Sequence, residues 1–487
     1  MAERNIRNLL SVGKDDAVAI TAPGRPSLTY KALVEHIDEI AAQLGSRGLT
    51  SSDRVAIVLP NGPEMASAFL CVASYMSAAP LNPSYKQVEY EFYLEDLNPK
   101  LVIIEQNCSN PVKEAASKLS IPFVEIKVAE NAAAGIFSLF ETSQTIQLPS
   151  AQNEALVLHT SGTTSRPKVV PLTQANLVAS AGNIARTLKL NDKDHSLNIM
   201  PLFHIHGLIA VLCASMSAGA SVCCTAGFNA LKFFELAVSE KVTWYSGVPT
   251  MHQAILLRGK RHAETAKALN LRFIRSSSAS LPPAVFDKLA TLFICPVIEA
   301  YGMTEATHQM TTNLLPPFKR KVGSVGVPIG LEVKIINNNL NFIKKTEEGE
   351  IVIKGGSVLK KYLANDKANS SSFIDGWFRT GDLGYFDKDG HLFISGRIKE
   401  IINRGGEKVS PKEIDDVFSK HPKISKVVAF AVKHDKLGED VAIAVVLNKG
   451  KKCTSSELKD FVKNKLAQFK TPKKIYFLNE IPIGATG

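Results

Sequence analysis

Short apolar runs recur between residues 54 and 300, and segments with amphipathic helical spacing separate them. The runs cover residues 54–59, 101–104, 156–158, 197–200, 221–224, 242–246, 271–274 and 297–300. Short apolar runs bounded by turn residues are typical of strands buried on both faces of a parallel sheet. The alternation of strand and helix therefore predicts doubly wound α/β sheets, whose ligands bind beyond the carboxyl ends of the strands.

After about Gly323 closely spaced strands replace this alternation. Strands are expected at 333–336 and 350–353, and a tight hairpin is expected around 386–391. Strands this close together, joined by short turns, indicate a small antiparallel barrel.

A Lys-rich α+β pattern begins near Glu400. Its expected helices and strands are helices near 411–419 and 455–467 and strands at 427–432 and 441–447. A chain of this length needs more than one core. We therefore expect a large N-terminal domain over 1–398 and a small C-terminal domain over 399–487.

Composition and charge narrow the classes of function. The 487 residues, of which 45% are hydrophobic and 21% charged, are expected to fold throughout. The net charge of +11 suits nucleic acid, an acidic membrane surface or small anionic ligands. Lys and Arg are scattered, however, and no nucleic-acid-binding module is recognisable, so a primary nucleic-acid role is not expected. Seven cysteines without a C-x-x-C pair predict reduced thiols in a cytoplasmic protein.

One uncharged stretch, 195–231, resembles a membrane span only superficially. Pro201, Gly207, Gly219 and Gly227 interrupt it, and such residues divide a chain into short elements. We expect a strand, a turn, a helix and a second strand here, and no membrane span.

The segment 159–168, His-Thr-Ser-Gly-Thr-Thr-Ser-Arg-Pro-Lys, directly follows a predicted strand. Its N–H groups and hydroxyls can donate to phosphate oxygens, and its lysine adds positive charge. It is not the loop of the nucleotide hydrolases, which needs Gly-Lys-Ser/Thr, because Pro167 precedes the lysine here. A polar turn is the alternative. The predicted phosphate ligands are Thr160, Ser161, Gly162, Thr163, Thr164 and Lys168.

This loop resembles a motif of the adenylate-forming enzymes, the family of acyl-CoA synthetases, luciferases and peptide-synthetase adenylation domains. Three more segments match the family's motifs in the same order, namely Tyr301-Gly302-Met303-Thr304-Glu305, Arg379-Thr380-Gly381-Asp382 and 396–408. The resemblance implies that Thr304 contacts the α-phosphate and Glu305 binds Mg²⁺, both of which stabilise charge at phosphorus. It also implies that Asp382 binds the ribose, that Arg397 reaches the nucleotide and that the C-terminal domain is mobile, rotating at Lys399.

The same resemblance implies ATP, Mg²⁺ and coenzyme A, and it assigns roles to two sets of residues. The catalytic set is Lys168, His204, Thr304, Glu305 and Arg397. The nucleotide-binding set outside the phosphate loop is Ser278, Ala279, Ser280, Glu299, Ala300, Tyr301, Thr304, Asp382, Arg397, Lys399, Gly405, Gly406 and Lys408.

The family's last motif is Pro-x-x-x-x-Gly-Lys, and Pro482 to Gly487 matches it up to the glycine. In the family the lysine that follows bridges the carboxylate and the α-phosphate during adenylation. We therefore expect the C-terminal domain to be truncated before the catalytic lysine, which would weaken adenylation more than thioester formation.

The residue after Met200-Pro201-Leu202-Phe203 separates substrate classes. Family members that adenylate amino acids carry an Asp shortly after the equivalent segment, to pair with the substrate amine, whereas this chain has His204. The resemblance therefore disfavours an amino acid and favours a coenzyme A ligase.

Four longer stretches resemble the oxalate-CoA ligases and their 4-coumarate-CoA-ligase-like relatives, namely 159–171, 203–207, 272–281 and 305–310. An acid with a second carboxylate needs hydrogen-bond donors where ligases of aromatic or fatty acids have apolar walls. The expected substrate contacts are His204, His206, Ser278 and His308. A lone histidine in a core segment, however, is more often a structural residue than a ligand-binding one.

We therefore expect an ATP-dependent acid–CoA ligase that adenylates a small carboxylic acid, with oxalate as the first choice, and releases AMP and pyrophosphate. The alternatives are a ligase of 4-coumarate or another short acid, and a non-catalytic AMP-binding relative. We expect a cytoplasmic monomer or homodimer, or a peroxisomal protein if the true C-terminus carries a targeting tripeptide.

Overall fold

Two large sheets form most of the molecule, whose computed structural model describes residues 5–160 and 167–482. One sheet has the strand order β6-β5-β3-β4-β7-β8, and the other has the order β15-β14-β13-β12-β11-β9-β10-β1-β2. The strands of the first are β3 Arg54–Val58, β4 Ser77–Pro80, β5 Leu101–Ile104, β6 Phe123–Glu125, β7 Glu154–His159 and β8 Val169–Thr173. The strands of the second are β1 Val18–Thr21, β2 Leu28–Thr29, β9 His195–Asn198, β10 Ser221–Cys224, β11 Trp244–Gly247, β12 Phe273–Ser276, β13 Val297–Met303, β14 His308–Thr312 and β15 Val327–Pro328.

The inner strands of both sheets run parallel, as the apolar runs predict. Antiparallel strands close the edges: β8 pairs with β7, β2 pairs with β1, and β14 turns back along β13. The turn between β13 and β14 was not predicted, and it places the strand that begins at His308 beside the predicted Tyr301–Glu305 motif.

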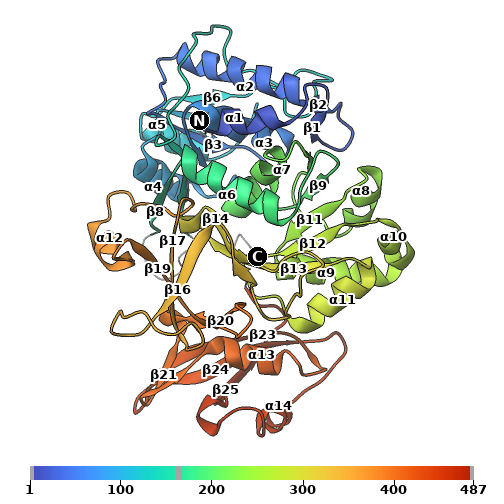
Figure 1. Ribbon diagram of the computed structural model, residues 1–487, viewed down its shortest axis with the longest axis vertical. Helices are drawn as coiled ribbons and strands as arrows, with labels where there is room; N and C mark the ends of the chain where they lie inside the picture. Colours follow the sequence, from blue (N-terminus) through green and yellow to red (C-terminus); the bar gives the residue numbers. More distant parts are fainter. Residues whose placement is uncertain (1–4, 161–166, 483–487) are drawn as a thin grey trace.

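Helices cover the two sheets and fill the space between them (Figure 1). Helix α3, Pro63–Tyr75, contacts strands of both sheets, and its side chains are almost all buried because it is apolar around its whole circumference. The other helices of this part are α1 Ile6–Leu9, α2 Tyr30–Gly45, α4 Gln87–Leu97, α5 Val112–Lys118, α6 Gln174–Thr187, α7 Ala214–Met216, α8 Phe233–Ser239, α9 Pro249–Gly259, α10 Ala263–Ala268 and α11 Pro283–Phe293.

The uncharged stretch 195–231 folds as predicted. Strand β9 leads through a turn to a π-helix, His206–Cys213, which continues into α7 and then reaches β10. None of the helices within the described ranges is both long and apolar enough to cross a membrane.

A five-stranded antiparallel sheet follows, as the change of pattern after Gly323 predicts. Strands β16, β17, β19 and β18 lie in this order, and β20 pairs with β19. Their bounds are β16 Leu331–Ile336, β17 Gly349–Gly355, β18 Phe373–Ile374, β19 Trp377–Phe386 and β20 Leu392–Arg397, with α12 Asp366–Ser372 before β18. The predicted hairpin joins β19 to β20, where the Asp387 N–H donates to the His391 carbonyl at 2.9 Å.

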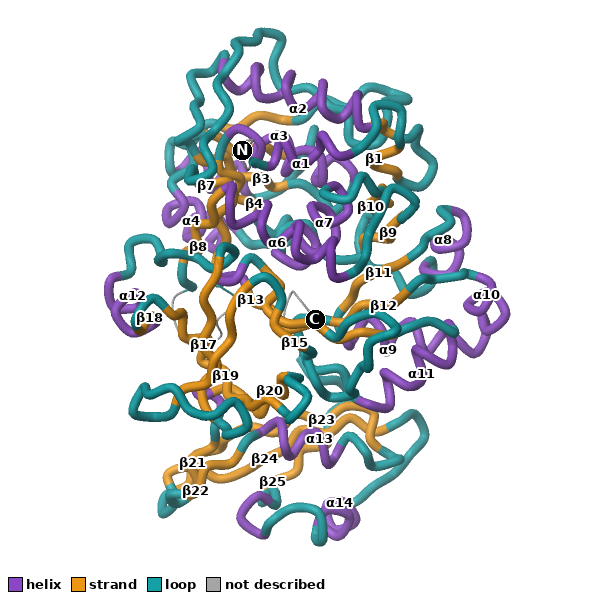
Figure 2. The backbone as a smooth tube through the Cα atoms, in the orientation of Figure 1, coloured by secondary structure: helices purple, strands orange, loops and turns teal. Residues whose placement is uncertain are grey.

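The last part of the chain forms a separate small sheet at one end of the molecule (Figure 2). Its elements are β21 Ile402–Arg404, β22 Glu407–Val409, α13 Pro411–Phe418, β23 Ile424–His434, β24 Gly438–Leu447, α14 Ser455–Val462 and β25 Lys474–Phe477. Helix α14 ends earlier than expected, after Leu458 and Val462 have completed its buried face. The proposed domain boundary between residues 398 and 399 falls in a 3-10 turn, Ile398–Glu400, and stays a prediction.

Candidate active site

The predicted phosphate loop joins β7 to β8, and its two ends are held together. The Lys168 N–H donates to Thr160 Oγ1 at 3.0 Å, and the Thr160 N–H donates to the Lys168 carbonyl at 2.9 Å. The loop between them is therefore closed at its base by an antiparallel pair. Ser161, Gly162, Thr163 and Thr164 lie outside the described residues.

Lys168 lies beside the predicted metal ligand. Its ammonium is 4.2 Å from the centre of the Tyr362 ring, and the Tyr362 hydroxyl donates to Glu305 Oε1 at 2.8 Å. Burial lowers the pKa of Lys168, with Glu305 acting against this and Lys399 adding to it. Residues of three predicted motifs, Lys168, Glu305 and Lys399, thus lie near one another, and the buried Glu305 carboxylate is of the ligand type that would hold Mg²⁺.

The predicted ribose ligand Asp382 is held from two sides. Its carboxylate accepts a hydrogen bond from the Tyr301 hydroxyl and pairs with Arg397 Nε at 3.1 Å. Strand pairing places Asp382 directly opposite Arg397. Burial raises the pKa of Asp382, with Arg397 opposing this shift.

Glu299 anchors the loop that carries the predicted adenine-side residues. Its carboxylate accepts from the Leu281 N–H at 3.2 Å and from the Gly323 N–H at 3.3 Å, and burial raises its pKa to about 7. The Ser277 hydroxyl donates to the Ala300 carbonyl at 2.9 Å. Glu299 and Ala300 therefore position the exposed residues Ser278, Ala279 and Ser280 at the carboxyl end of β12.

His204 and Thr304 line one cavity of about 40 Å³, together with Tyr85, Tyr93 and His159. His204 Nε2 is buried without a described hydrogen-bond partner, and burial lowers the pKa of His204 to about 4. The imidazole is therefore neutral at pH 7. A neutral ring with an unused nitrogen, facing the same space as Thr304, is available to a ligand.

The other predicted substrate contacts form one polar cluster. His206 Nδ1 lies 3.0 Å from Ser278 Oγ, and the rings of His206 and His308 meet edge to face at 4.8 Å. Both histidines are only 2% exposed, whereas Ser278 is exposed. Burial lowers the pKa of each histidine, and the positive charge of Arg275 lowers it further.

Sequence reasoning missed Arg275 and Tyr362. Arg275 lies at the centre of the histidine cluster. The resemblance covers the stretch 272–281 that contains it but gives this residue no role. The signal available in the sequence was a charged residue inside an otherwise buried strand, since Phe273, Ile274 and Arg275 are consecutive in β12. Tyr362 belongs to no motif, and nothing in the sequence indicated it.

No described contact joins Gly405, Gly406 or Lys408 to the other predicted site residues. They lie on the hairpin between β21 and β22, where the Gly405 N–H donates to the Leu437 carbonyl at 2.9 Å. Their part in nucleotide binding stays a prediction.

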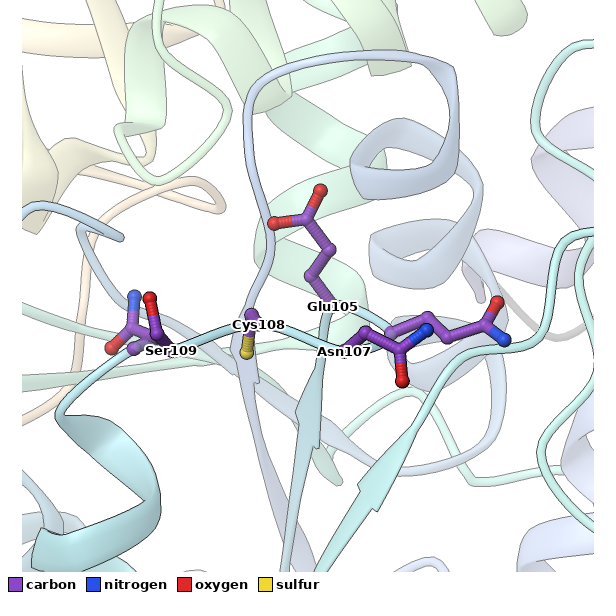
Figure 3. Close-up of a pocket in the computed structure, with 6 residues that line it drawn as sticks. Glu105, Asn107, Cys108 and Ser109 are labelled. Atoms are coloured by element: carbon purple, nitrogen blue, oxygen red, sulfur yellow. The ribbon is translucent and has the colours of Figure 1, made fainter.

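A second hollow, of about 440 Å³, lies in the loop 105–110 after β5 (Figure 3). Polar side chains and the thiol of Cys108 line it, and none of the predicted site residues does. It is therefore separate from the site.

Comparison with known proteins agrees with this arrangement. The family model described as AMP-binding enzyme matches residues 11–363, and the one described as AMP-binding enzyme C-terminal domain matches residues 413–487. A relative from Arabidopsis thaliana, named Oxalate–CoA ligase, is 43% identical over 482 residues, which are 97% of this chain and 94% of the relative. A relative of the same name from Saccharomyces cerevisiae is 42% identical over 508 residues, covering 97% of this chain and 93% of the relative.

A solved structure has the same fold. ATP-bound MatB from Rhodopseudomonas palustris matches with a TM-score of 0.90 at 27% identity, covering 100% of this chain and 97% of MatB. The order of the motifs, the clustering of their side chains, the two family models and these relatives lead to one conclusion: the chain belongs to the AMP-binding enzyme family.

Proposed function

We propose that the chain is an ATP-dependent acid–CoA ligase and that its acid is oxalate. In the first step a carboxylate oxygen of the acid attacks the α-phosphorus of ATP, and the bond to pyrophosphate breaks. In the second step the sulfur of coenzyme A attacks the acyl carbon, the thiol loses its proton, and AMP leaves with the bridging oxygen. ATP, Mg²⁺ and coenzyme A are the groups that this reaction needs.

The proposed roles follow from the contacts. Lys168 and Thr304 would contact phosphate oxygens, and Glu305 would hold Mg²⁺, which would supply positive charge to the phosphates. Asp382 accepts hydrogen bonds from the ribose. His204, beside Thr304, lines the path of the acid.

One observation supports a small polar acid above all others. The cluster of His206, Ser278 and His308 puts polar atoms where an aromatic or long-chain acid needs an apolar wall. The two relatives named Oxalate–CoA ligase support oxalate in particular.

The test is a coenzyme A ligation assay with the full-length protein, in which oxalate, malonate, acetate and 4-coumarate compete. We expect oxalyl-CoA as the main product, with pyrophosphate released only when acid is present. Turnover of 4-coumarate or acetate alone would contradict the choice of acid and leave the ligase reaction in place. If none of these acids leads to release of pyrophosphate, the non-catalytic alternative is favoured.

Two finer points belong to the same proposal. We propose a cytoplasmic location and a monomer or homodimer. Fractionation of cells and light scattering of the purified protein test the two points separately.

A further inference from the structure

Arg275 is a wholly buried cation at the centre of the histidine cluster. It is 0% exposed and lies in β12, between the neighbouring strands β11 and β13. Its Nη1 contacts Ser246 Oγ at 3.3 Å and His206 Nε2 at 3.4 Å. Its Nη2 contacts Gln309 Oε1 at 3.1 Å and His308 Nδ1 at 3.5 Å.

All four partners are uncharged. Within residues 5–160 and 167–482, no carboxylate pairs with Arg275, and its buried Nε–H has no hydrogen-bond partner. Burial lowers the pKa of the guanidinium to about 9, so the group still carries its charge at pH 7. A buried charge is costly unless it is paired, and this one has no counter-charge among the described residues.

The neutral side chains around Arg275 carry further hydrogen-bond donors. Arg275 only donates, and the Ser246 hydroxyl oxygen that accepts from it at 3.3 Å also lies 2.6 Å from His206 Nε2. The Ser278 hydroxyl lies 3.0 Å from His206 Nδ1 at the exposed end of the cluster. His308 accepts at Nδ1 and keeps its proton on Nε2. The cluster is thus rich in donors and lacks an anionic acceptor.

The cluster also adjoins the residues proposed to bind ATP. Strand pairing places His308 directly opposite Met303, which precedes Thr304 in the chain. Directly opposite residues in an antiparallel pair have Cα atoms about 5 Å apart. Ser278, which contacts His206, belongs to the exposed loop at the end of β12. One end of the cluster therefore faces the nucleotide side, and the other end is the buried guanidinium.

We propose that the Arg275 guanidinium binds the carboxylate of the acid that does not react with ATP, and that this contact selects a dianionic acid over a monoanionic one. The proposal rests on the proposed function, because it presupposes that an acid is activated next to Thr304. The charges balance: the two neutral histidines add none, so the cluster offers one positive charge to one carboxylate. The other carboxylate stays free to attack phosphorus.

The experiment compares oxalate with oxamate, in which a neutral amide replaces one carboxylate, and with acetate. Arg275→Met removes the charge and keeps much of the side chain's volume, while Arg275→Lys restores the charge. Arg272→Met is the matched control, because Arg272 lies just before β12 and pairs with Asp194 at 3.0 Å, outside the cluster. We measure kcat and KM for each acid at saturating ATP and coenzyme A.

In Arg275→Met we expect kcat/KM for oxalate to fall about 100-fold or more, mainly through KM, because truncating one partner of a buried charge pair has effects of this size. The values for oxamate and acetate should change less than about threefold, and Arg275→Lys should recover part of the oxalate activity. Arg272→Met should keep the wild-type preference for oxalate over oxamate. An equal loss for all three acids in Arg275→Met would overturn the inference.

Two results separate failure of the inference from failure of the proposed function. Wild-type protein that activates acetate or 4-coumarate but no dicarboxylic acid would overturn the proposed choice of acid, on which the inference rests, and leave the ligase reaction in place. Wild-type protein that uses oxalate and oxamate equally well would overturn only the inference. If Arg275→Met does not fold, a crystal structure of the wild-type protein with oxalate and an unreactive ATP analogue decides. A carboxylate within hydrogen-bond distance of the guanidinium supports the proposal, and chloride or water alone at that place overturns it.

Discussion

The Tyr362 hydroxyl donates a hydrogen bond of 2.8 Å to Glu305, and the face of the same ring lies 4.2 Å from the Lys168 ammonium. One side chain therefore contacts both the proposed metal ligand and the proposed phosphate-binding cation. The hydroxyl fixes the carboxylate, and the ring attracts the ammonium through its negative face.

Tyr362→Phe separates these two contacts, because it keeps the ring and removes the hydroxyl. A hydrogen bond to a charged group contributes about 1.5–3 kcal/mol, so we expect pyrophosphate release to slow about tenfold or more and to need more Mg²⁺. Titration of Mg²⁺ at fixed ATP measures this. Tyr385→Phe, at an exposed tyrosine of β19, is the control and should behave as wild type. An unchanged Mg²⁺ requirement in Tyr362→Phe would contradict the role given to Glu305.

Asp382→Asn should weaken the binding of ATP and leave the binding of the acid nearly unchanged. The substitution keeps the shape of the side chain but removes the charge that accepts hydrogen bonds, and charge-assisted bonds are about twice as strong as neutral ones. We expect KM for ATP to rise about 10-fold to 100-fold. Asp389→Asn, which removes only an exposed partner of Lys321, is the control, since exposed ion pairs contribute about 0–1 kcal/mol. Equal rises in the KM values of ATP and oxalate would argue against a ribose contact.

Ser278→Ala should raise KM for oxalate about tenfold, because the acid loses one proposed donor and His206 loses one of its partners. The hydroxyl is not needed to fold the loop, which Ser277 and Glu299 hold. Thermal unfolding should therefore occur at the wild-type temperature. Steady-state kinetics at saturating ATP measures the change, and an unaltered KM for oxalate would remove Ser278 from the substrate contacts.

The raised pKa of Glu299 predicts how the free energy of unfolding depends on pH. Its pKa rises from 4.5 to about 7 on folding because the carboxyl is buried, so the folded state holds a proton that the unfolded state has already lost between these values. The protonated Glu299 carboxyl makes its full contribution to the free energy of unfolding below about pH 4.5. This contribution is lost as pH rises to about 7, and it amounts to about 3 kcal/mol at most. Glu299→Gln cannot ionise, so its free energy of unfolding should fall less between pH 5 and pH 8 than that of wild type.

Denaturant unfolding at both pH values tests this prediction. Glu347→Gln, at an exposed carboxylate, is the control and should keep the wild-type dependence. Part of the dependence should survive in Glu299→Gln, because burial also raises the pKa of Asp415 to about 7. Parallel curves for wild type and Glu299→Gln would contradict the assignment.

The sequence was sufficient for those parts of the fold in which the local pattern and the tertiary environment agree. The buried parallel strands are apolar throughout, so their runs were recognisable, and the motif residues follow them as expected. Strand β14 was missed because its residues, from His308 to Thr312, are mostly polar. These polar groups are buried only because partners far away in the chain satisfy them, for example the Val325 carbonyl, which accepts from the Thr311 hydroxyl at 2.7 Å.

The same limit applies to the site. Lys168 and Glu305 were identified by their motifs, but the motifs do not contain Tyr362, which joins them. Arg275 was overlooked because a charged residue in a core strand contradicts the rule that identified that strand. The role proposed for Arg275 depends on the two histidines around it, which come from the π-helix and from β14.

Asp382 already has partners before any ribose arrives, since Tyr301 and Arg397 both hold its carboxylate. An ionised carboxylate has about four acceptor positions, so Asp382 can accept from ribose hydroxyls while both partners stay in place. The ion pair joins β19 to β20 within the five-stranded sheet, so this acceptor is held in place by its own sheet. A ribose bound there would meet an acceptor that is already ordered, so little side-chain entropy would be lost on binding.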